Sequence, residues 1–435
     1  MPKAVAEDRC SAVVASYFTD RVLKYDTKNG PQEYQVTGGV PQSSVLGSLL
    51  WNIMYDGLLK FVLPRAVKLV AFADDVALVI VAKHLEDINN LFDVAFARIR
   101  RWMETAGLKL AEHKTEAVLI TSRKKLETIT LRVGEHEITS QPFIRYLGVM
   151  IDSRLNFTRQ AEHASTKASA VEAVLSRIMP NVRGPKQKRR ALLSSVVTSV
   201  LTYGIAIWAD ALTLQESQRK MAPVYRLSAL RIASAFCTVS EDAVCVIAGV
   251  LPIGVLAEER RSLYRRRGST SMSAEELKTE ERQSSLKRWQ QSWDASIKGR
   301  WTYRLISKVD RWFNRNHSAV NYYLTQMLSG HGCFRAYLYK FKYEDSPECL
   351  TCSGVEEDAE HAFFACPRFD TQRSDLEAAI KQKVTPETLV EMMLLSEIAW
   401  EVTSAFATEV LTQLRREEQV RVKQKKQKDG DHQNP

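Results

Sequence analysis

The sequence contains little cysteine for its length, with 7 cysteines among 435 residues. Disulfide-dependent secreted scaffolds are much richer in cysteine, so that class of protein is excluded. The odd count and the close spacing of Cys349 and Cys352 favour a reducing compartment and a metal site. Met1 is followed by Pro2 and Lys3 without an apolar stretch, so we expect no secretory signal.

Long hydrophobic runs are scarce too. Residues 191–209 are uncharged and long enough to cross a membrane. Several serines and threonines lie within this stretch and Asp210 closes it, so we expect a buried helix of a large domain and no membrane partner. We find no internal repeat.

The charge balance is basic. Lys and Arg number 61 against 51 Asp and Glu, which gives a formal net charge of +10 and a pI near 9.1. This balance is compatible with a nucleic-acid or anionic partner. Apolar residues at 45% and charged residues at 26% are ordinary globular values, which excludes wholesale disorder. The length predicts two or three domains at about 150 residues each.

The first 151 residues mix strand and helix signals, which predicts an α+β fold. Two apolar, β-branched runs at 67–73 and 76–82 are separated by Asp74 and Asp75, so we predict a hairpin with both carboxylates at its tip. Helical spacing over 88–106 ends at Gly107. Together with further short strands, this order predicts a helix packed on one face of an antiparallel sheet. Those strands are predicted at 117–121, 129–133, near 138 and at 146–151.

Strand signals largely vanish beyond residue 152, and helical periods dominate. The composition predicts five further segments. They are a helical region at 152–267, a linker with a Trp-rich helical region at 268–345, a Cys/His segment at 346–370, a C-terminal helix region at 371–418, and a basic disordered tail at 419–435. We expect the tryptophans between 289 and 312 to pack in a helical core rather than to stack on bases.

The adjacent aspartates suit metal-dependent chemistry. Phosphoryl transfer by two metal ions needs carboxylates that converge within about 4 Å, and a hairpin tip presents two of them at little entropic cost. A solvated turn is the alternative explanation for Asp74 and Asp75.

The Cys/His segment has ligand spacing. Cys349, Cys352, His361 and Cys366 supply four ligands in the pattern C-x₂-C-x₈-H-x₄-C, which fits closed tetrahedral Zn²⁺ with a structural role. The alternative is structural thiols beside an exposed histidine, and Cys333 and His331 are further candidate ligands.

Four elements carry a family resemblance. GVPQSSVLGS at 39–48, FADDVALVI at 72–80, AGLKLAEHKTE at 106–116 and IRYLGVMID at 144–152 occur in the order of the palm elements of non-LTR retrotransposon reverse transcriptases. The sequence is most similar to the site-specific arthropod elements that insert into ribosomal genes. LSGHGCFRAYL and CPRF, on either side of the cysteines, resemble the same family. The resemblance implies a partial right-hand polymerase palm at 1–151, a thumb-like region at 152–267 and a CCHC zinc knuckle at 346–370.

The resemblance also implies roles for particular residues. Asp74 and Asp75 would hold Mg²⁺ on the incoming triphosphate and the attacking 3′-hydroxyl. Lys114 would stabilise or protonate the departing pyrophosphate, with a solvated surface lysine as the alternative. The nucleotide and template base would rest on Pro41, Gln42, Ser43 and Ser44. The implied partners are an element RNA template, target DNA and deoxynucleoside triphosphates, and the implied localisation is nuclear with a cytoplasmic ribonucleoprotein stage.

The sequence also departs from the family pattern. Ser43 and Ser48 stand where the family has glycine and proline, and no aspartate precedes Gly39 in the family's upstream metal-binding setting. The fingers and the endonuclease domain have no counterpart, as expected of a copy truncated at its 5′ end. We therefore expect impaired or absent polymerase activity from this chain alone. The alternative is a non-catalytic nucleic-acid-binding protein that uses the knuckle and the basic clusters at 183–190, 260–267 and 421–428.

Overall fold

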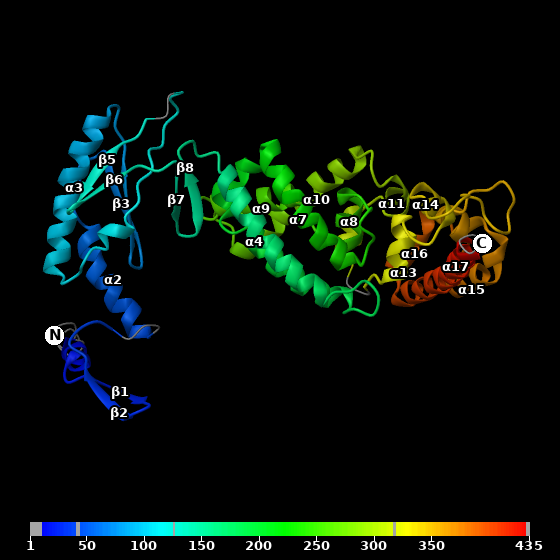
Figure 1. The fold of residues 1–435 in the computed structure, drawn as a ribbon, viewed down its shortest axis with the longest axis horizontal. Coiled ribbons are helices and arrows are strands. Elements are labelled where there is room, and N and C mark those ends of the chain that lie inside the picture. The colour runs from blue at the N-terminus through cyan, green and yellow to red at the C-terminus, as the bar shows by residue number, and fades with distance from the viewer. Residues whose placement is uncertain (1–10, 41–43, 125–126, 316–318, 432–435) are drawn as a thin grey trace. The chain divides into compact units, whose positions relative to one another are not determined.

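The computed structural model describes residues 11–40, 44–124, 127–315 and 319–431 (Figure 1). The chain divides into two compact units, residues 1–142 and residues 143–435. Both contain helices and small antiparallel sheets, and in the described part of the chain each sheet has two strands.

The first unit alternates hairpins with two long helices. Its elements are β1 (Val22–Thr27), β2 (Gly30–Gln35), α2 (Val45–Leu59), β3 (Val67–Phe72), β4 (Asp75–Ile80), α3 (Leu85–Thr105), the 3₁₀ turn η1 (Glu112–Lys114), β5 (Thr130–Val133) and β6 (His136–Thr139). The predicted acidic hairpin and the helix ending near Gly107 are confirmed. The predicted combination of helices with antiparallel strands is confirmed, but the strands form separate hairpins, and 117–121 contributes a single bridge through Val118.

The β1–β2 hairpin is an element that the strand analysis did not predict. Thr27 pairs with Gly30 across a two-residue turn, and Asn29-Gly30 is a strong short-range hairpin signal. The core of this unit forms elsewhere, where Tyr55 and Leu58 of α2 pack with Ile99 of α3. Burial of these side chains fixes α2 beneath the β3–β4 hairpin, whose Leu69 and Leu78 join the same cluster.

The second unit begins with one hairpin and continues as helices. Its elements are β7 (Phe143–Tyr146), β8 (Val149–Asp152), α4 (Thr158–Arg177), α5 (Gln187–Leu201), α6 (Ile205–Trp208), η2 (Ala209–Thr213), α7 (Gln215–Ala233), α8 (Glu241–Ala248), α9 (Ile253–Arg266), α10 (Ala274–Ala295), α11 (Arg300–Leu305), α12 (Val309–Phe313), α13 (Tyr322–Ser329), α14 (Arg335–Lys340), the π-helical turn η3 (His361–Ala365), η4 (Pro367–Phe369), α15 (Asp370–Ile380), α16 (Pro386–Leu395) and α17 (Glu397–Asp431). One hydrophobic core runs through it, and Trp289, Trp293 and Trp312 are buried there, which confirms their predicted packing role.

The β7–β8 hairpin is built into this helical unit. Leu147 and Gly148 form its turn, both with positive φ, and the Tyr203 hydroxyl donates a hydrogen bond to the Leu147 carbonyl at 3.0 Å. The buried Asp152 carboxylate accepts from the backbone N–H of Phe157 at 2.7 Å and so ties β8 to the start of α4. The IRYLGVMID segment at 144–152 therefore folds with the helices that follow it.

The uncharged stretch at 191–209 is not one helix. α5 ends at Leu201, and Gly204, at φ +63°, starts α6. Within the described ranges no single helix has the length and apolarity to cross a membrane, although α5 and the segment Ile205–Thr213, bent by 54°, meet those criteria as a pair.

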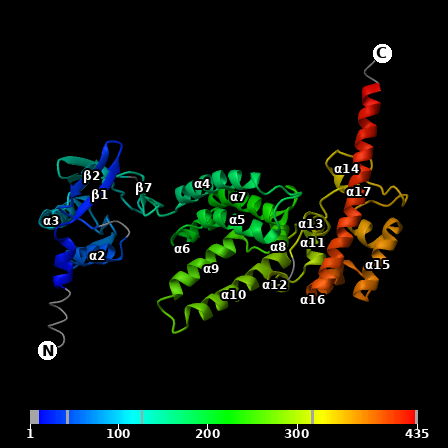
Figure 2. The ribbon, with the colours of Figure 1, turned by 90° about the horizontal axis from the view of Figure 1, so that it is seen from below.

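Two predicted irregular segments are helical. Residues 265–281 form the end of α9, a short turn and the start of α10, and the two helices lie side by side (Figure 2). Ser273 and Glu276 form a capping box that starts α10, so the Ser-x-x-Glu signal outweighs the polar composition there. The tail expected to be disordered is also helical as far as Asp431, and the predicted C-terminal helix region at 371–418 contains α15, α16 and the first part of α17.

Candidate functional sites: an acidic hairpin and a Cys/His cluster

The β3–β4 hairpin presents the two aspartates at an exposed turn. Phe72 pairs with Asp75, so the turn consists of Ala73 and Asp74, and Asp75 is the first residue of β4. Ala73 adopts φ +53°, a left-handed conformation that costs about 1 kcal/mol for a residue with a Cβ. A conformation of this kind persists only where its surroundings hold it in place.

Helix α2 supplies that support. The Trp51 indole N–H donates a hydrogen bond to the Ala73 carbonyl at 3.0 Å, and Trp51 stacks on Tyr55 with ring centroids 4.9 Å apart. Burial raises the pKa of Tyr55, and the charges of Asp74 and Asp75 raise it further. Both carboxylates therefore lie within electrostatic range of one phenol. Sequence reasoning missed this pair of aromatics, although their i, i+4 spacing on a helix is a readable signal.

The other residues predicted to serve polymerase chemistry are not joined to the two aspartates by contacts in the described structure. Lys114 lies in η1 and is exposed, and in the described residues no hydrogen bond or ion pair joins it to either aspartate. Ser44 is the N-cap of α2 and accepts a hydrogen bond from the Gly47 N–H at 3.0 Å. The remaining predicted nucleotide-binding residues, Pro41, Gln42 and Ser43, lie outside the described residues.

The four predicted zinc ligands meet at one point. One ligand atom from each of Cys349, Cys352, His361 and Cys366 lies within 4.8 Å of all the others, and the Sγ atoms of Cys349 and Cys366 are 3.8 Å apart. The hairpin-like turn after Cys352 passes through Gly354 at φ +74°, where glycine is unstrained. Cys333 and His331 are not part of this group.

The donor set fits a metal ion. In the described structure the His361 Nε2 is buried without a hydrogen-bond partner, which is costly unless a ligand satisfies it. Burial lowers the pKa of His361 and raises the pKa of Cys366 to about 11, so the imidazole is neutral and the metal-free thiol keeps its proton. The backbone N–H of Thr351 points at the Cys349 sulfur at 3.5 Å, a contact that favours a thiolate.

Charged side chains that sequence reasoning did not single out hold this cluster in place. Arg368 donates to the buried Glu357 at 2.5 Å and to Glu417 of α17 at 2.8 Å. Arg373 donates to the Cys366 carbonyl at 2.8 Å. The ion pair between Arg368 and Glu417 therefore joins the Cys/His loop to the long C-terminal helix.

Several arginines of the basic clusters form hydrogen bonds or ion pairs within the protein. Arg190 is 2% exposed and donates to the carbonyls of Met179, Pro180, Pro185 and Arg231, at the ends of α4 and α7. Much of the 183–190 cluster is exposed, but the Arg190 guanidinium is buried and therefore cannot bind the phosphates of a nucleic acid. In the 260–267 cluster, Arg261 pairs with Asp210 and Glu258, and Arg266 pairs with Glu280 and Glu281.

Comparison with known proteins places the acidic hairpin within a segment that matches a known family. The family model of reverse transcriptase (RNA-dependent DNA polymerase) matches residues 5–151. The chain is 26% identical over 383 residues to a Retrovirus-related Pol polyprotein from type-1 retrotransposable element R1 2 of Nasonia vitripennis, which covers 83% of this chain and 93% of that protein. It is also 26% identical to a putative 115 kDa protein in type-1 retrotransposable element R1DM of Drosophila melanogaster and to an R1 Pol polyprotein of Bradysia coprophila. Those matches cover 92% and 82% of this chain but only 40% and 37% of the relatives. No solved structure matches this chain.

The hairpin that exposes the paired aspartates lies within the residues matched by the reverse transcriptase family model. Similarity to the Pol polyproteins extends through the helical unit. Residues 5–151 match the reverse transcriptase family, and the chain as a whole is similar to Pol polyproteins of R1-type retrotransposable elements.

Proposed function

We propose that this chain takes part in RNA-templated DNA synthesis, with Asp74 and Asp75 as Mg²⁺ ligands. The observation that carries the proposal is the exposed, α2-supported hairpin turn that presents both carboxylates inside the residues matched by the reverse transcriptase family. Carboxylate oxygens are the ligands that Mg²⁺ prefers, and bound Mg²⁺ neutralises charge on a triphosphate and a 3′-hydroxyl. The substrates are then an RNA template, a DNA primer end at the target and deoxynucleoside triphosphates.

Trp51 has a positioning role in this proposal. Its hydrogen bond to the Ala73 carbonyl holds the strained turn in the conformation that brings Asp74 beside Asp75. Lys114 is proposed to stabilise the pyrophosphate that leaves, since an exposed ammonium suits a polyanion.

The test is primer extension on an RNA template with purified protein, Mg²⁺ and deoxynucleotides. The double variant Asp74→Asn/Asp75→Asn is expected to lose extension. Asp56→Asn is the matched control, because Asp56 is an exposed α2 carboxylate paired with Lys60 and is expected to leave extension unchanged. No extension by the unmodified chain, with RNA binding retained, would contradict catalysis and leave a non-catalytic nucleic-acid-binding protein.

We further infer that Cys349, Cys352, His361 and Cys366 bind structural Zn²⁺. The closed four-ligand set and the unpartnered His361 Nε2 support this. Zinc bound here would cross-link the loop, and no chemical step is assigned to it. The expected zinc content is one ion per chain, lost in Cys366→Ser and kept in Cys237→Ser, a control at an exposed cysteine outside the cluster. Equal zinc content in both variants would refute the ligand assignment.

A further inference from the structure

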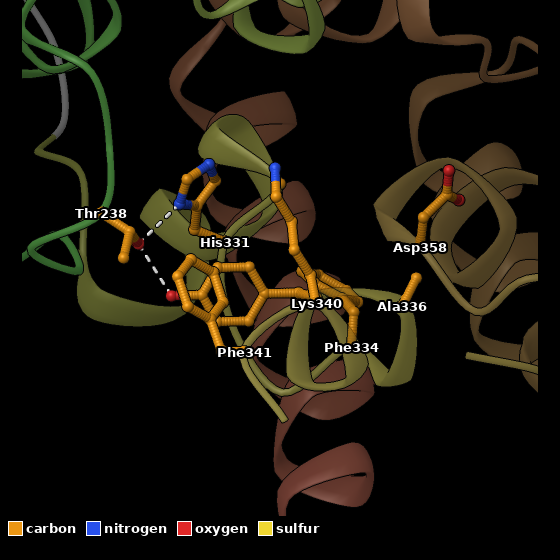
Figure 3. Close-up of a pocket in the computed structure, with 9 residues that line it drawn as sticks. Thr238, His331, Phe334, Ala336, Lys340, Phe341 and Asp358 are labelled. Carbon is orange, nitrogen blue, oxygen red and sulfur yellow. Dashed lines mark hydrogen bonds between the residues drawn. The ribbon is translucent and has the colours of Figure 1, made fainter. Parts of the chain in front are cut away.

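A cavity of about 270 Å³ lies beside α14, and its lining includes Asp358, three residues before the candidate ligand His361 (Figure 3). Phe334 is its fully buried wall, and exposed Lys340 and Phe341 contribute to its rim. Its volume is near the lower end of small-molecule sites, about 300–1,000 Å³, so it suits a single ring system. Neither the polymerase proposal nor the zinc proposal uses this cavity.

Polar groups converge inside the cavity. The Thr238 hydroxyl lies 2.8 Å from His331 Nδ1 and 2.7 Å from the Tyr337 hydroxyl (Figure 3). Burial, with a smaller effect of Lys340, lowers the pKa of His331 to about 4, so the imidazole is neutral near pH 7. A neutral imidazole and two hydroxyls can both donate and accept, as the edge of a nucleobase requires.

The segment that leaves the cavity alternates aromatic and basic side chains. Tyr339, Phe341 and Tyr343 are 48%, 40% and 71% exposed, and Lys340 and Lys342 lie between them. Large aromatic side chains gain most from burial, so three exposed ones within five residues indicate a binding surface. The α14 surface is the name used here for residues 339–343 together with the cavity.

The α14 surface carries two lysines and one carboxylate, which leaves it with a net positive charge. The carboxylate is Asp358 in the cavity lining, which accepts a hydrogen bond from the His361 N–H at 2.8 Å and, among the described residues, forms no ion pair. In the described structure neither Lys340 nor Lys342 forms an ion pair. The carboxylates that follow are already neutralised, because Glu344 pairs with Arg421 at 2.7 Å and Asp345 pairs with Lys425 at 2.5 Å. The two lysines are therefore available to an anionic ligand.

The backbone of this segment is strained at one of the lysines. α14 ends with the Tyr343 N–H bonded to the Leu338 carbonyl and the Lys342 N–H bonded to the Tyr339 carbonyl, both at 2.9 Å. This Schellman arrangement places Lys342 at φ +63°, a position that glycine usually fills. A charged side chain kept at a strained position is typical of a functional site.

We propose that the α14 surface binds single-stranded RNA, with one base in the cavity against Tyr337 and Phe341 and the next base on Tyr343. Lys340 and Lys342 then neutralise the phosphates that flank these bases. Aromatic side chains beside cations form the usual platform for unpaired bases, which is why an RNA strand fits this surface better than an acidic peptide. RNA rather than DNA follows from the proposed function, on which this inference rests, because it brings an unpaired RNA template to the chain.

The test is binding of a fluorescently labelled 12-nucleotide oligouridine to the purified full chain, measured by anisotropy. Stacking of one base is worth a change of about 5- to 150-fold in Kd, so Phe341→Ala and Tyr343→Ala are each expected to weaken binding by at least 5-fold. The double variant Lys340→Ala/Lys342→Gly is expected to weaken binding and to reduce the slope of log K against log salt by about 1.4, or 0.7 per phosphate.

Tyr264→Ala is the matched control, because Tyr264 is 68% exposed on α9 and is expected to leave Kd unchanged. The Tyr343 and lysine variants alter exposed side chains, so equal melting temperatures will show that they fold. Unchanged Kd in all three α14 variants would overturn the inference, as would tighter binding of oligothymidine than of oligouridine. Primer extension by the unmodified chain is measured separately. If the unmodified chain makes no DNA, but the α14 variants bind RNA more weakly than it does, only the proposed function is refuted.

Discussion

Glu172 makes the stability of the second unit depend on pH. This α4 carboxylate is 1% exposed, and within the described structure neither of its oxygens has a hydrogen-bond partner. Burial raises its pKa from 4.5 to about 7, and the nearby charge of Arg231 offsets only part of that effect. The folded state therefore binds this proton more tightly than the unfolded state does.

The sign and size follow from proton linkage. A carboxyl with a raised folded-state pKa costs nothing below pH 4.5, and its ionisation destabilises the fold progressively as pH rises from about 4.5 to 7. A rise in pKa from 4.5 to about 7 corresponds to at most about 3 kcal/mol above pH 7. Glu172→Gln removes the charge while keeping the shape of the side chain. We therefore expect this variant to be more stable than the unmodified chain at pH 8 by about 1–3 kcal/mol, and no more stable at pH 5.

The assay is urea unfolding at pH 5, 6, 7 and 8, followed by tryptophan fluorescence. Glu401→Gln, an exposed substitution on α17, is the control and should show a difference that does not vary with pH. A stability difference for Glu172→Gln that is the same at pH 5 and pH 8 would refute the reasoning, because it would mean that the carboxyl keeps its ordinary pKa.

Three further changes have expected outcomes. Arg190→Ala should lower the free energy of unfolding by about 3 kcal/mol or more, because it leaves the carbonyls of four residues without their donor. The exposed neighbour provides the control, and Arg189→Ala should lower this free energy by less than about 0.5 kcal/mol. Similar losses for the two variants in urea titrations would argue against a structural role of the buried Arg190 guanidinium. Lowering the pH from 7 to 5 should release zinc from the Cys366 site, measured with a chromogenic chelator, because protons compete for its thiolates. Trp51→Phe should reduce primer extension more than it reduces melting temperature, and an unchanged rate would show that the indole hydrogen bond does not position the turn.

Local signals predicted the sites better than they predicted the architecture. The two apolar, β-branched runs on either side of Asp74 and Asp75 predict a hairpin, and the spacing of the four Cys/His ligands predicts a metal cluster. Both signals depend on residues close in sequence. The separation into two-stranded sheets depends on which strands find partners, and no periodicity encodes that. Polar composition misled the analysis at 268–281, where a capping box starts a helix whose stability comes from packing on α9.

Contacts between residues distant in sequence could not be predicted either. Nothing in the order of residues shows that Tyr203 reaches the Leu147 turn, or that Arg190 closes the ends of two helices. From sequence alone, a run of basic residues is easily interpreted as a phosphate-binding surface, because its hydrogen-bond and ion-pair partners within the protein are visible only in the fold. The exposed alternation at 339–343 was legible in the sequence but gained meaning only once the neighbouring carboxylates proved to be paired and the cavity lay beside it.

The Cys/His loop and α14 are joined by hydrogen bonds, so zinc bound at the loop would also support RNA binding at the α14 surface. The Glu357 carbonyl accepts from the Ala336 N–H of α14 at 3.1 Å, and Arg368, two residues after Cys366, holds the Glu357 carboxylate. Removal of a zinc ion bound at the four candidate ligands would free the loop, and α14 would then lose the partner that fixes its first turn. Chelation of zinc is therefore expected to weaken oligouridine binding while leaving Tyr343→Ala, already deficient, little changed. Equal loss of affinity in both proteins on chelation would show that zinc acts on RNA elsewhere, because a shared path through α14 makes the two perturbations non-additive.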